Sequence, residues 1–128
     1  MSEGIYNAVL LDHARHPRNK GIIEPADYSY EDDSFACGDE VRIDVRVTDR
    51  HIAAIAFSGR GCAVSQASAS ILTEMVEGMS LVEVQALTKD DLMAIIGVTL
   101  SPSRITCALL SWRVLSASLF GVDPDVEM

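Results

Sequence analysis

The sequence has few basic residues and no long apolar segment. Its 128 residues include 10 Lys and Arg against 19 Asp and Glu, which gives a formal net charge of -9 at pH 7. Such an acidic protein is a poor partner for the phosphates of nucleic acid, whose binding depends on Lys and Arg. The longest apolar stretch, residues 92–100, falls well short of the roughly 20 residues that span a membrane. We therefore expect neither nucleic acid nor a membrane as a partner.

Cysteine is also scarce, and the three cysteines cannot all pair within one chain. Cys37, Cys62 and Cys107 are widely separated, which does not fit the framework of a secreted, disulfide-rich domain. The N-terminus lacks the basic and apolar regions of a signal peptide, so we expect a cytoplasmic protein. Cysteines in a reducing compartment stay as thiols, and two interpretations remain open: metal or thiol chemistry, and inert burial.

Common catalytic and phosphate-binding motifs are missing. The sequence contains no Gly-rich phosphate loop, no His-Glu-x-x-His and no Gly-x-Ser-x-Gly. No local motif links His13, His16 or His51 to a cysteine as its general base, so we expect these histidines to lie mostly on the surface. His13 would approach a site only if the first helix packs there.

The composition that remains is typical of one packed domain, which we assign to residues 1–128. Hydrophobic residues make up 48% and charged residues 23% of the chain. Apolar and polar side chains alternate over residues 41–48, which predicts a strand with one buried face and one solvated face. A second strand over residues 51–58 would complete an antiparallel hairpin.

Helical periodicity precedes and follows this hairpin. Residues 21–35 predict a loop with an edge strand at residues 28–30, and the acidic run at residues 31–33 indicates a solvated surface. Early strands and late helices predict an α+β fold, a small antiparallel sheet packed against helices. The predicted helices are residues 2–16, a helix from Cys62 to Gly78, short helices at 81–87 and 90–96, and a last helix from Ser101-Pro102.

Each cysteine stands near the start of a predicted element. In Cys37-Gly38-Asp39, the glycine permits a sharp turn that lets the Cys37 thiolate and the Asp39 carboxylate point at one cation. Cys62 opens a helix, where backbone N–H groups and the helix dipole favour a thiolate. Cys107 lies near the beginning of the last helix. Their spacing alone does not establish a metal site, because it differs from the paired Cys-x-x-Cys of zinc fingers.

The motifs together, in this order, resemble one protein family over nearly the whole chain. That family is the iron–sulfur cluster scaffold family, which includes IscU, SufU and the N-terminal domain of NifU. The segments that carry the resemblance are Asp12-His13 with Pro17-Arg18-Asn19, Cys37-Gly38-Asp39, Gly61-Cys62-Ala63-Val64-Ser65, and Cys107-Ala108-Leu109 with Trp112.

The resemblance implies a carrier and not an enzyme. Such a scaffold accepts sulfur from a cysteine desulfurase, combines it with iron and passes a transient [2Fe-2S] cluster to recipient apoproteins. It also implies that Cys37, Asp39, Cys62 and Cys107 converge as ligands of iron or of the cluster. Thiolates are the usual cluster ligands, and an oxygen ligand would bind the cluster less firmly, which suits later release.

The sequence departs from both main branches of this family. Thr106 stands where IscU proteins have a histidine before the third cysteine, which favours Asp39 as the fourth ligand. Residues 100–104, Leu-Ser-Pro-Ser-Arg, differ from the Leu-Pro-Pro-Val-Lys motif of IscU, and this weakens the case for a dedicated Hsp70-type chaperone as a partner. SufU proteins carry an insertion between the second and third cysteines for which this chain has little room.

Two alternatives to the scaffold stay open. The first is a SufU-type sulfurtransferase in which Zn²⁺, held by the same four residues, keeps the thiols reactive. By resemblance, the persulfide acceptor would be Cys37 in the SufU branch and Cys107 in the IscU branch. The second is a family member that only docks on partners through its acidic surface.

Overall fold

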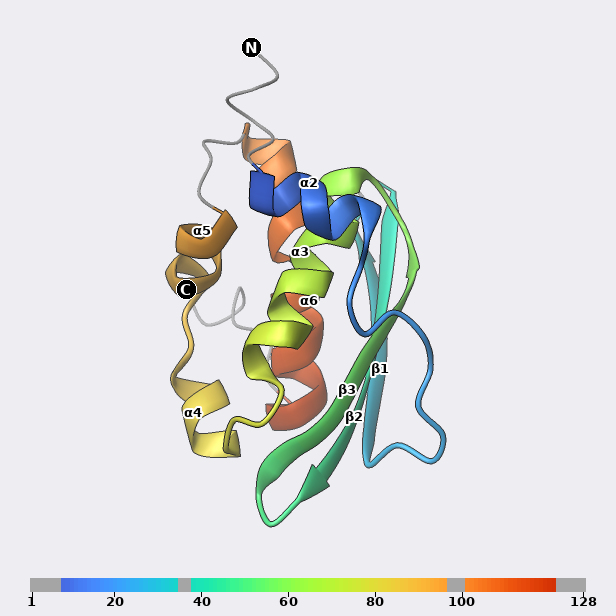
Figure 1. Ribbon diagram of the computed structural model, residues 1–128, viewed down its shortest axis with the longest axis vertical. Helices are drawn as coiled ribbons and strands as arrows, with labels where there is room; N and C mark the ends of the chain where they lie inside the picture. Colours follow the sequence, from blue (N-terminus) through green and yellow to red (C-terminus); the bar gives the residue numbers. More distant parts are fainter. Residues whose placement is uncertain (1–7, 35–37, 97–100, 122–128) are drawn as a thin grey trace.

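The chain folds into a small antiparallel sheet covered on one face by helices (Figure 1). The computed structural model describes residues 8–34, 38–96 and 101–121. Its sheet has the order β1-β2-β3, and the α+β prediction is confirmed. The strands are β1 (Tyr28–Ser34), β2 (Asp39–Thr48) and β3 (His51–Arg60); the helices are α2 (Ala8–Arg15), α3 (Ala63–Val76), α4 (Leu81–Ala86), α5 (Lys89–Ile96) and α6 (Pro102–Phe120).

The central hairpin follows from the alternation in the sequence. Val41, Ile43 and Val45 are fully buried on the inner face of β2. Asp49 and Arg50 both have positive φ, 52° and 63°, which is the backbone of a type I′ turn and matches the twist of the paired strands. The predicted hairpin is therefore confirmed, with β2 and β3 each slightly longer than expected.

The core lies between this sheet and two helices. Helix α6 packs over β1 and β2, helix α3 packs over β3, and the two helices also contact each other (Figure 1). Phe57 from the sheet, Leu72 from α3 and Leu110 from α6 are at most 1% exposed. Burial of each such side chain stabilises the fold by about 1.5–3 kcal/mol relative to its exposure. The shared core fixes the ends of three elements relative to one another.

Local signals set the helix boundaries. Ser80 caps α4 in a complete capping box, in which Ser80 Oγ accepts from Glu83 N at 3.1 Å and Glu83 Oε1 accepts from Ser80 N at 2.9 Å. Ser101 caps α6, and Pro102 stands in its first turn, as predicted.

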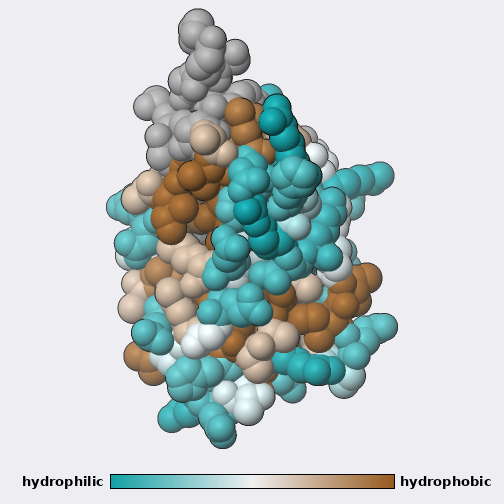
Figure 2. All heavy atoms as spheres, in the orientation of Figure 1, coloured by the Kyte–Doolittle hydropathy of each residue, from teal (hydrophilic) through white to brown (hydrophobic). Residues whose placement is uncertain are grey.

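No helix in the described ranges is long and apolar enough to cross a membrane. In Figure 2 most of the visible face is hydrophilic, with hydrophobic residues gathered near α5.

Strand β1 is longer than the sequence predicts. It runs through the acidic residues to Ser34, whereas only residues 28–30 were expected to be extended. Pairing with β2 explains the difference, because Glu31 stands opposite Arg42 and the opposite charges favour this register. Pairing with a neighbouring strand therefore extends β1 into acidic residues whose composition predicts a loop.

Asp44 is a second difference from the prediction, because it is buried although it lies on the face of β2 that the sequence predicts to be solvated. Its carboxylate is fully buried and accepts hydrogen bonds from Ser29 Oγ at 2.6 Å, Arg42 Nε at 3.0 Å and Ile23 N at 3.2 Å. Burial raises the pKa of Asp44, but these three donors outweigh it and hold the pKa below its usual value. The segment before β1 therefore fastens onto the sheet through this carboxylate.

Helix α2 is fastened to α3 by a buried histidine, so the surface position expected for His13 is wrong. His13 is 6% exposed, and its Nδ1 lies 2.7 Å from Ser70 Oγ. Ser70 Oγ also accepts from Arg18 N at 2.8 Å. This face of α3 thus holds both the first helix and the turn that follows it.

The environment of His13 makes the stability of the fold depend on pH. Burial, and then the neighbouring Arg18 guanidinium, lower the pKa of His13 below 6.5, while Glu74 and Asp12 oppose this. The unfolded chain therefore takes up the proton first on acidification. The stabilisation is complete above pH 6.5 and is lost as the pH falls from there through the folded-state pKa.

We expect this loss to be visible in the free energy of unfolding measured between about pH 7.5 and about pH 5.5 by denaturant titration. His13→Gln should flatten the pH dependence in this window, because glutamine does not titrate. His51→Gln, at an exposed position, is the matched control and should keep the wild-type slope. An equal slope in wild type and His13→Gln would contradict the prediction.

Candidate metal centre

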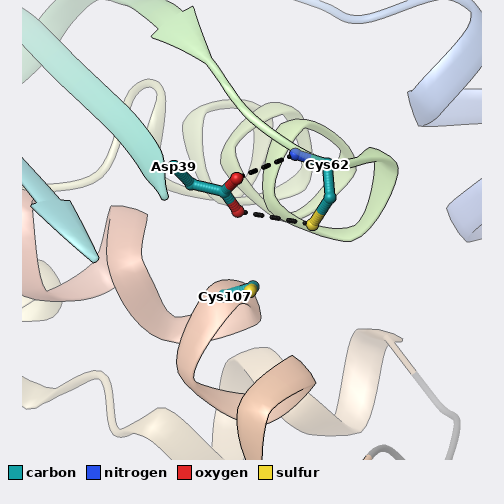
Figure 3. A group of neighbouring side chains, drawn as sticks. All are labelled: Asp39, Cys62 and Cys107. Carbon is teal, nitrogen blue, oxygen red and sulfur yellow. Dashed lines mark hydrogen bonds between the residues drawn. The ribbon is translucent and has the colours of Figure 1, made fainter. Parts of the chain in front are cut away.

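Three of the four predicted ligands meet at one end of the molecule. Asp39 is the first residue of β2, Cys62 precedes α3, and Cys107 lies in the second turn of α6. One ligand atom from each lies within 4.8 Å of the others. Figure 3 shows the carboxylate of Asp39 directed at Cys62, with Cys107 across from both. Cys37, the fourth predicted ligand, lies outside the described residues.

Asp39 and Cys62 make two contacts with each other. Asp39 Oδ1 accepts from Cys62 N at 3.0 Å, and Cys62 Sγ donates to Asp39 Oδ2 at 3.3 Å (Figure 3). Cys62 is also the N-cap of α3, and its Sγ accepts from Ser65 N at 3.5 Å. The carboxylate thus joins the start of β2 to the start of α3, and the sulfur lies at the positive end of the helix dipole.

Two glycines explain how the strand and the helix come so close. A Cβ on Gly61 would lie 2.6 Å from Asp39 Cγ, and a Cβ on Gly59 would lie 2.3 Å from the carbonyl oxygen of Glu40. Gly59 also has a φ of +118°, which side chains rarely adopt. Gly61 is therefore needed for close packing against Asp39, and Gly59 for the close approach of β3 to the backbone of Glu40.

Burial and charge favour a cation between these groups. Asp39 is 2% exposed, Cys107 is 1% exposed and Cys62 is half-buried. A thiolate and a carboxylate this close and this far from water repel each other unless a proton or a cation lies between them. Tetrahedral zinc with ligand distances of about 2.0–2.3 Å holds its ligand atoms about 3.5–3.8 Å apart, so small side-chain movements would suffice. The donor set suits zinc or iron with sulfide.

Cys107 differs from the expectation in one respect. It is disulfide-bonded in the structure, whereas the sequence analysis expected three thiols. Cys62, by contrast, is a free cysteine. Because only a thiolate binds metal, the site as described requires reduction of Cys107 before it can act as a ligand.

The histidines do not take part in this cluster. No histidine joins Asp39, Cys62 and Cys107 among the described residues. His13 instead lies beside Ser70, and its Nε2 is 3.6 Å from Glu74 Oε1. This arrangement resembles a Ser-His-acid triad. Ser70 is fully buried and its oxygen accepts from Arg18 N, so no substrate reaches it. This second cluster is structural.

Gly61→Ala tests whether the close approach of Asp39 matters for metal binding. The added methyl group would displace the Asp39 carboxylate, so we expect weaker binding of Zn²⁺ to the reduced protein, by about 10-fold or more, as for the loss of a ligand's supporting contacts. The measurement is competition with a chromophoric chelator, alongside circular dichroism to show that the fold persists. Wild-type affinity in a folded Gly61→Ala protein would show that Asp39 need not keep its position.

Comparisons with known proteins point to one family. The family model described as the NifU-like N-terminal domain matches residues 5–122. The chain is 30% identical over 128 residues to the zinc-dependent sulfurtransferase SufU of Bacillus subtilis, covering 87% of this chain and 86% of that protein. It is 34% identical over 115 residues to the iron–sulfur cluster assembly scaffold protein IscU 1 of Archaeoglobus fulgidus, covering 90% of this chain and 74% of that protein.

A solved structure shows the same fold. The crystal structure of a putative iron–sulfur cluster assembly scaffold protein for the SUF system, from Fervidobacterium islandicum, superposes with a TM-score of 0.78 at 27% identity. The match covers 93% of this chain and 99% of that one. The architecture is thus shared over nearly the full length of both chains.

Proposed function

Because the chain belongs to the family of the NifU-like N-terminal domain, we propose that it is a scaffold for iron–sulfur cluster assembly. The observation that carries the proposal is the meeting of Asp39, Cys62 and Cys107 at the ends of three elements. The Archaeoglobus fulgidus relative, an iron–sulfur cluster assembly scaffold protein IscU, supports it. In this proposal Cys37 completes the ligand set.

The residues of the site suggest how the chain would bind and release an iron–sulfur cluster. A [2Fe-2S] cluster is the substrate here, and reduced Cys62 and Cys107 would bind its iron as thiolates. Asp39 would supply an oxygen ligand, which binds soft iron less firmly than a thiolate does. Asp39 Oδ1 accepts from the backbone N of Cys62, so we expect Oδ2, which accepts from the Cys62 thiol, to bind the cargo once that thiol loses its proton. A single oxygen ligand of this kind favours release to a recipient apoprotein.

Sulfur would reach the site from a cysteine desulfurase as a persulfide. In that step a thiolate of this chain attacks the outer sulfur of the desulfurase persulfide, the S–S bond breaks, and the desulfurase cysteine leaves as a thiolate. Cys37 and Cys107 are the candidate acceptors. Cys107 is 1% exposed, which leaves an incoming persulfide little access to it.

Anaerobic reconstitution tests the scaffold. We expect the reduced wild-type protein, given iron, cysteine and a desulfurase, to develop sulfide-dependent visible absorption bands. Cys62→Ser should abolish these bands because it removes a thiolate ligand, and Asp39→Ala should alter their intensity or lifetime. Asp33→Ala, which removes an exposed carboxylate on β1, is the matched control and should behave as wild type. No bands from the wild type, or equal bands from Cys62→Ser, would contradict the proposal.

A zinc-dependent sulfurtransferase is the second candidate function. The Bacillus subtilis relative carries that name, and two thiolates with a carboxylate suit tetrahedral Zn²⁺. Bound zinc would hold the cysteines as thiolates, ready to accept sulfur. Metal analysis of the isolated protein and desulfurase turnover with and without it separate the two functions. Bound zinc with faster turnover favours the sulfurtransferase, and zinc-free protein without stimulation excludes it.

Mass spectrometry identifies the sulfur acceptor. The reduced protein is incubated with desulfurase and cysteine, and the added mass of one sulfur atom is located on peptides. Since Cys107 is buried, we expect Cys107→Ser to keep the adduct and Cys37→Ser to lose it. The reverse result would assign the acceptor to Cys107 and imply that α6 moves to expose it.

A further inference from the structure

Ser65 carries a buried hydroxyl for which the fold alone gives no reason. It stands in the first turn of α3, three residues after Cys62, and is 1% exposed. Among the residues that the structure describes, its Oγ has no hydrogen-bond partner. A buried hydroxyl without a partner costs stability, whereas alanine of nearly the same shape would avoid the cost. The hydroxyl therefore calls for a partner that is present only in another state of the site.

A comparison within the chain indicates where that partner lies. In α4 the residue at the third helical position, Glu83, reaches back to the N-cap and accepts from Ser80 N at 2.9 Å. Ser65 holds the same position in α3, but the N–H of its N-cap residue, Cys62, already donates to Asp39 Oδ1. The carbonyl oxygen of Cys62 already accepts from Gln66 N at 3.0 Å, and the other acceptor at this N-cap is Cys62 Sγ, which lies 3.5 Å from the backbone N of Ser65.

We propose that the Ser65 hydroxyl donates a hydrogen bond to Cys62 Sγ when this sulfur is a metal-bound thiolate. This inference rests on the proposed function. In the described state Cys62 Sγ–H donates to Asp39 Oδ2 and accepts from Ser65 N. Metal binding removes that proton and adds negative charge to the sulfur, which then accepts a second donor. Ser65 is thus a positioning residue that acts on the metal through Cys62.

Such supporting donors have measurable effects. Hydrogen bonds to metal ligands orient them and tune the metal, and hydrogen bonds to cluster sulfurs set the cluster's potential. With Ser65, the Cys62 sulfur would be held by two N3 donors, the backbone N–H and the side-chain hydroxyl. A buried hydroxyl with a merely structural role would affect folding and leave the metal unchanged.

Ser68 provides the matched control. It lies on the same helix, is fully buried, and its Oγ also has no hydrogen-bond partner within the described part of the chain. It stands six residues from Cys62, about one and a half helical turns away, and so cannot reach the sulfur. Ser68→Ala and Ser65→Ala delete the same group from the same helix and differ in access to the metal ligand.

The experiment measures metal affinity and metal spectra of reduced, anaerobic protein. We expect Ser65→Ala to weaken Zn²⁺ binding by about 10-fold or more in chelator competition, as for other partners of metal ligands. In the Co²⁺ form the sulfur-to-cobalt charge-transfer band should shift, because the sulfur loses a donor. Ser68→Ala should match wild type in both measurements, and the metal-free melting temperature of both variants should equal or exceed that of wild type.

A conservative variant and the control variant separate the possible outcomes of this experiment. Ser65→Thr, which keeps the hydroxyl, should restore the wild-type cobalt band. Wild-type affinity and an unshifted band in Ser65→Ala would overturn the inference and leave the proposed function intact. Equal losses in Ser65→Ala and Ser68→Ala would also overturn it, because the effect would then be one of packing. A wild-type protein that binds neither metal would overturn the inference together with the proposed metal site.

Discussion

The contact between Asp39 and Cys62 is the constraint on which the site depends. Through it, the first residue of β2 is bound to the N-cap of α3, by one oxygen to the backbone and by the other to the sulfur. The contact requires that residue 61 have no side chain and that residue 59 adopt a backbone that favours glycine. The core then brings α6, with Cys107, to the same end. Sheet and helices are thus arranged so that two sulfurs and a carboxylate meet where water is largely excluded.

The position of α3 depends on a second set of contacts, made with α2 and the turn that follows it. Ser70 Oγ accepts from Arg18 N and forms a hydrogen bond with His13 Nδ1, and Arg18 Nη2 also donates to Asp12 Oδ2 at 2.5 Å. Asn19, in a left-handed conformation, accepts through its carbonyl from Phe57 N and so extends this fastening to β3. The segment from Asp12 to Asn19 therefore connects α3 to α2 and to β3. Its motif residues support the helix that carries Cys62 and are not part of the group formed by Asp39, Cys62 and Cys107.

Sequence patterns predicted the elements whose causes are local. The alternation over residues 41–48 and the Ser80–Glu83 capping box both depend on neighbours along the chain, and both predictions are confirmed. The extension of β1 and the burial of Asp44 and His13 were missed, because each depends on a partner distant in the sequence, respectively Arg42, Ser29 and Ser70. Nothing in the separate spacing of the cysteines shows that Cys62 and Cys107 meet. That expectation came from the family resemblance, and the ligand roles themselves remain predictions.

A carboxylate among thiolates is a compromise between holding and releasing metal. Four thiolate ligands would bind an iron–sulfur cluster or zinc firmly, so the bound group would not leave easily. A lone carboxylate oxygen weakens one bond, and here the same carboxylate is also needed to hold Cys62 N. If the site binds metal as proposed, Asp39 can keep its contact with Cys62 N through Oδ1 while Oδ2 gives up the Cys62 thiol proton and binds the ion. In that proposal, metal binding would be linked to proton release from Cys62, and metal release to the return of a proton that restores the Sγ to Oδ2 hydrogen bond.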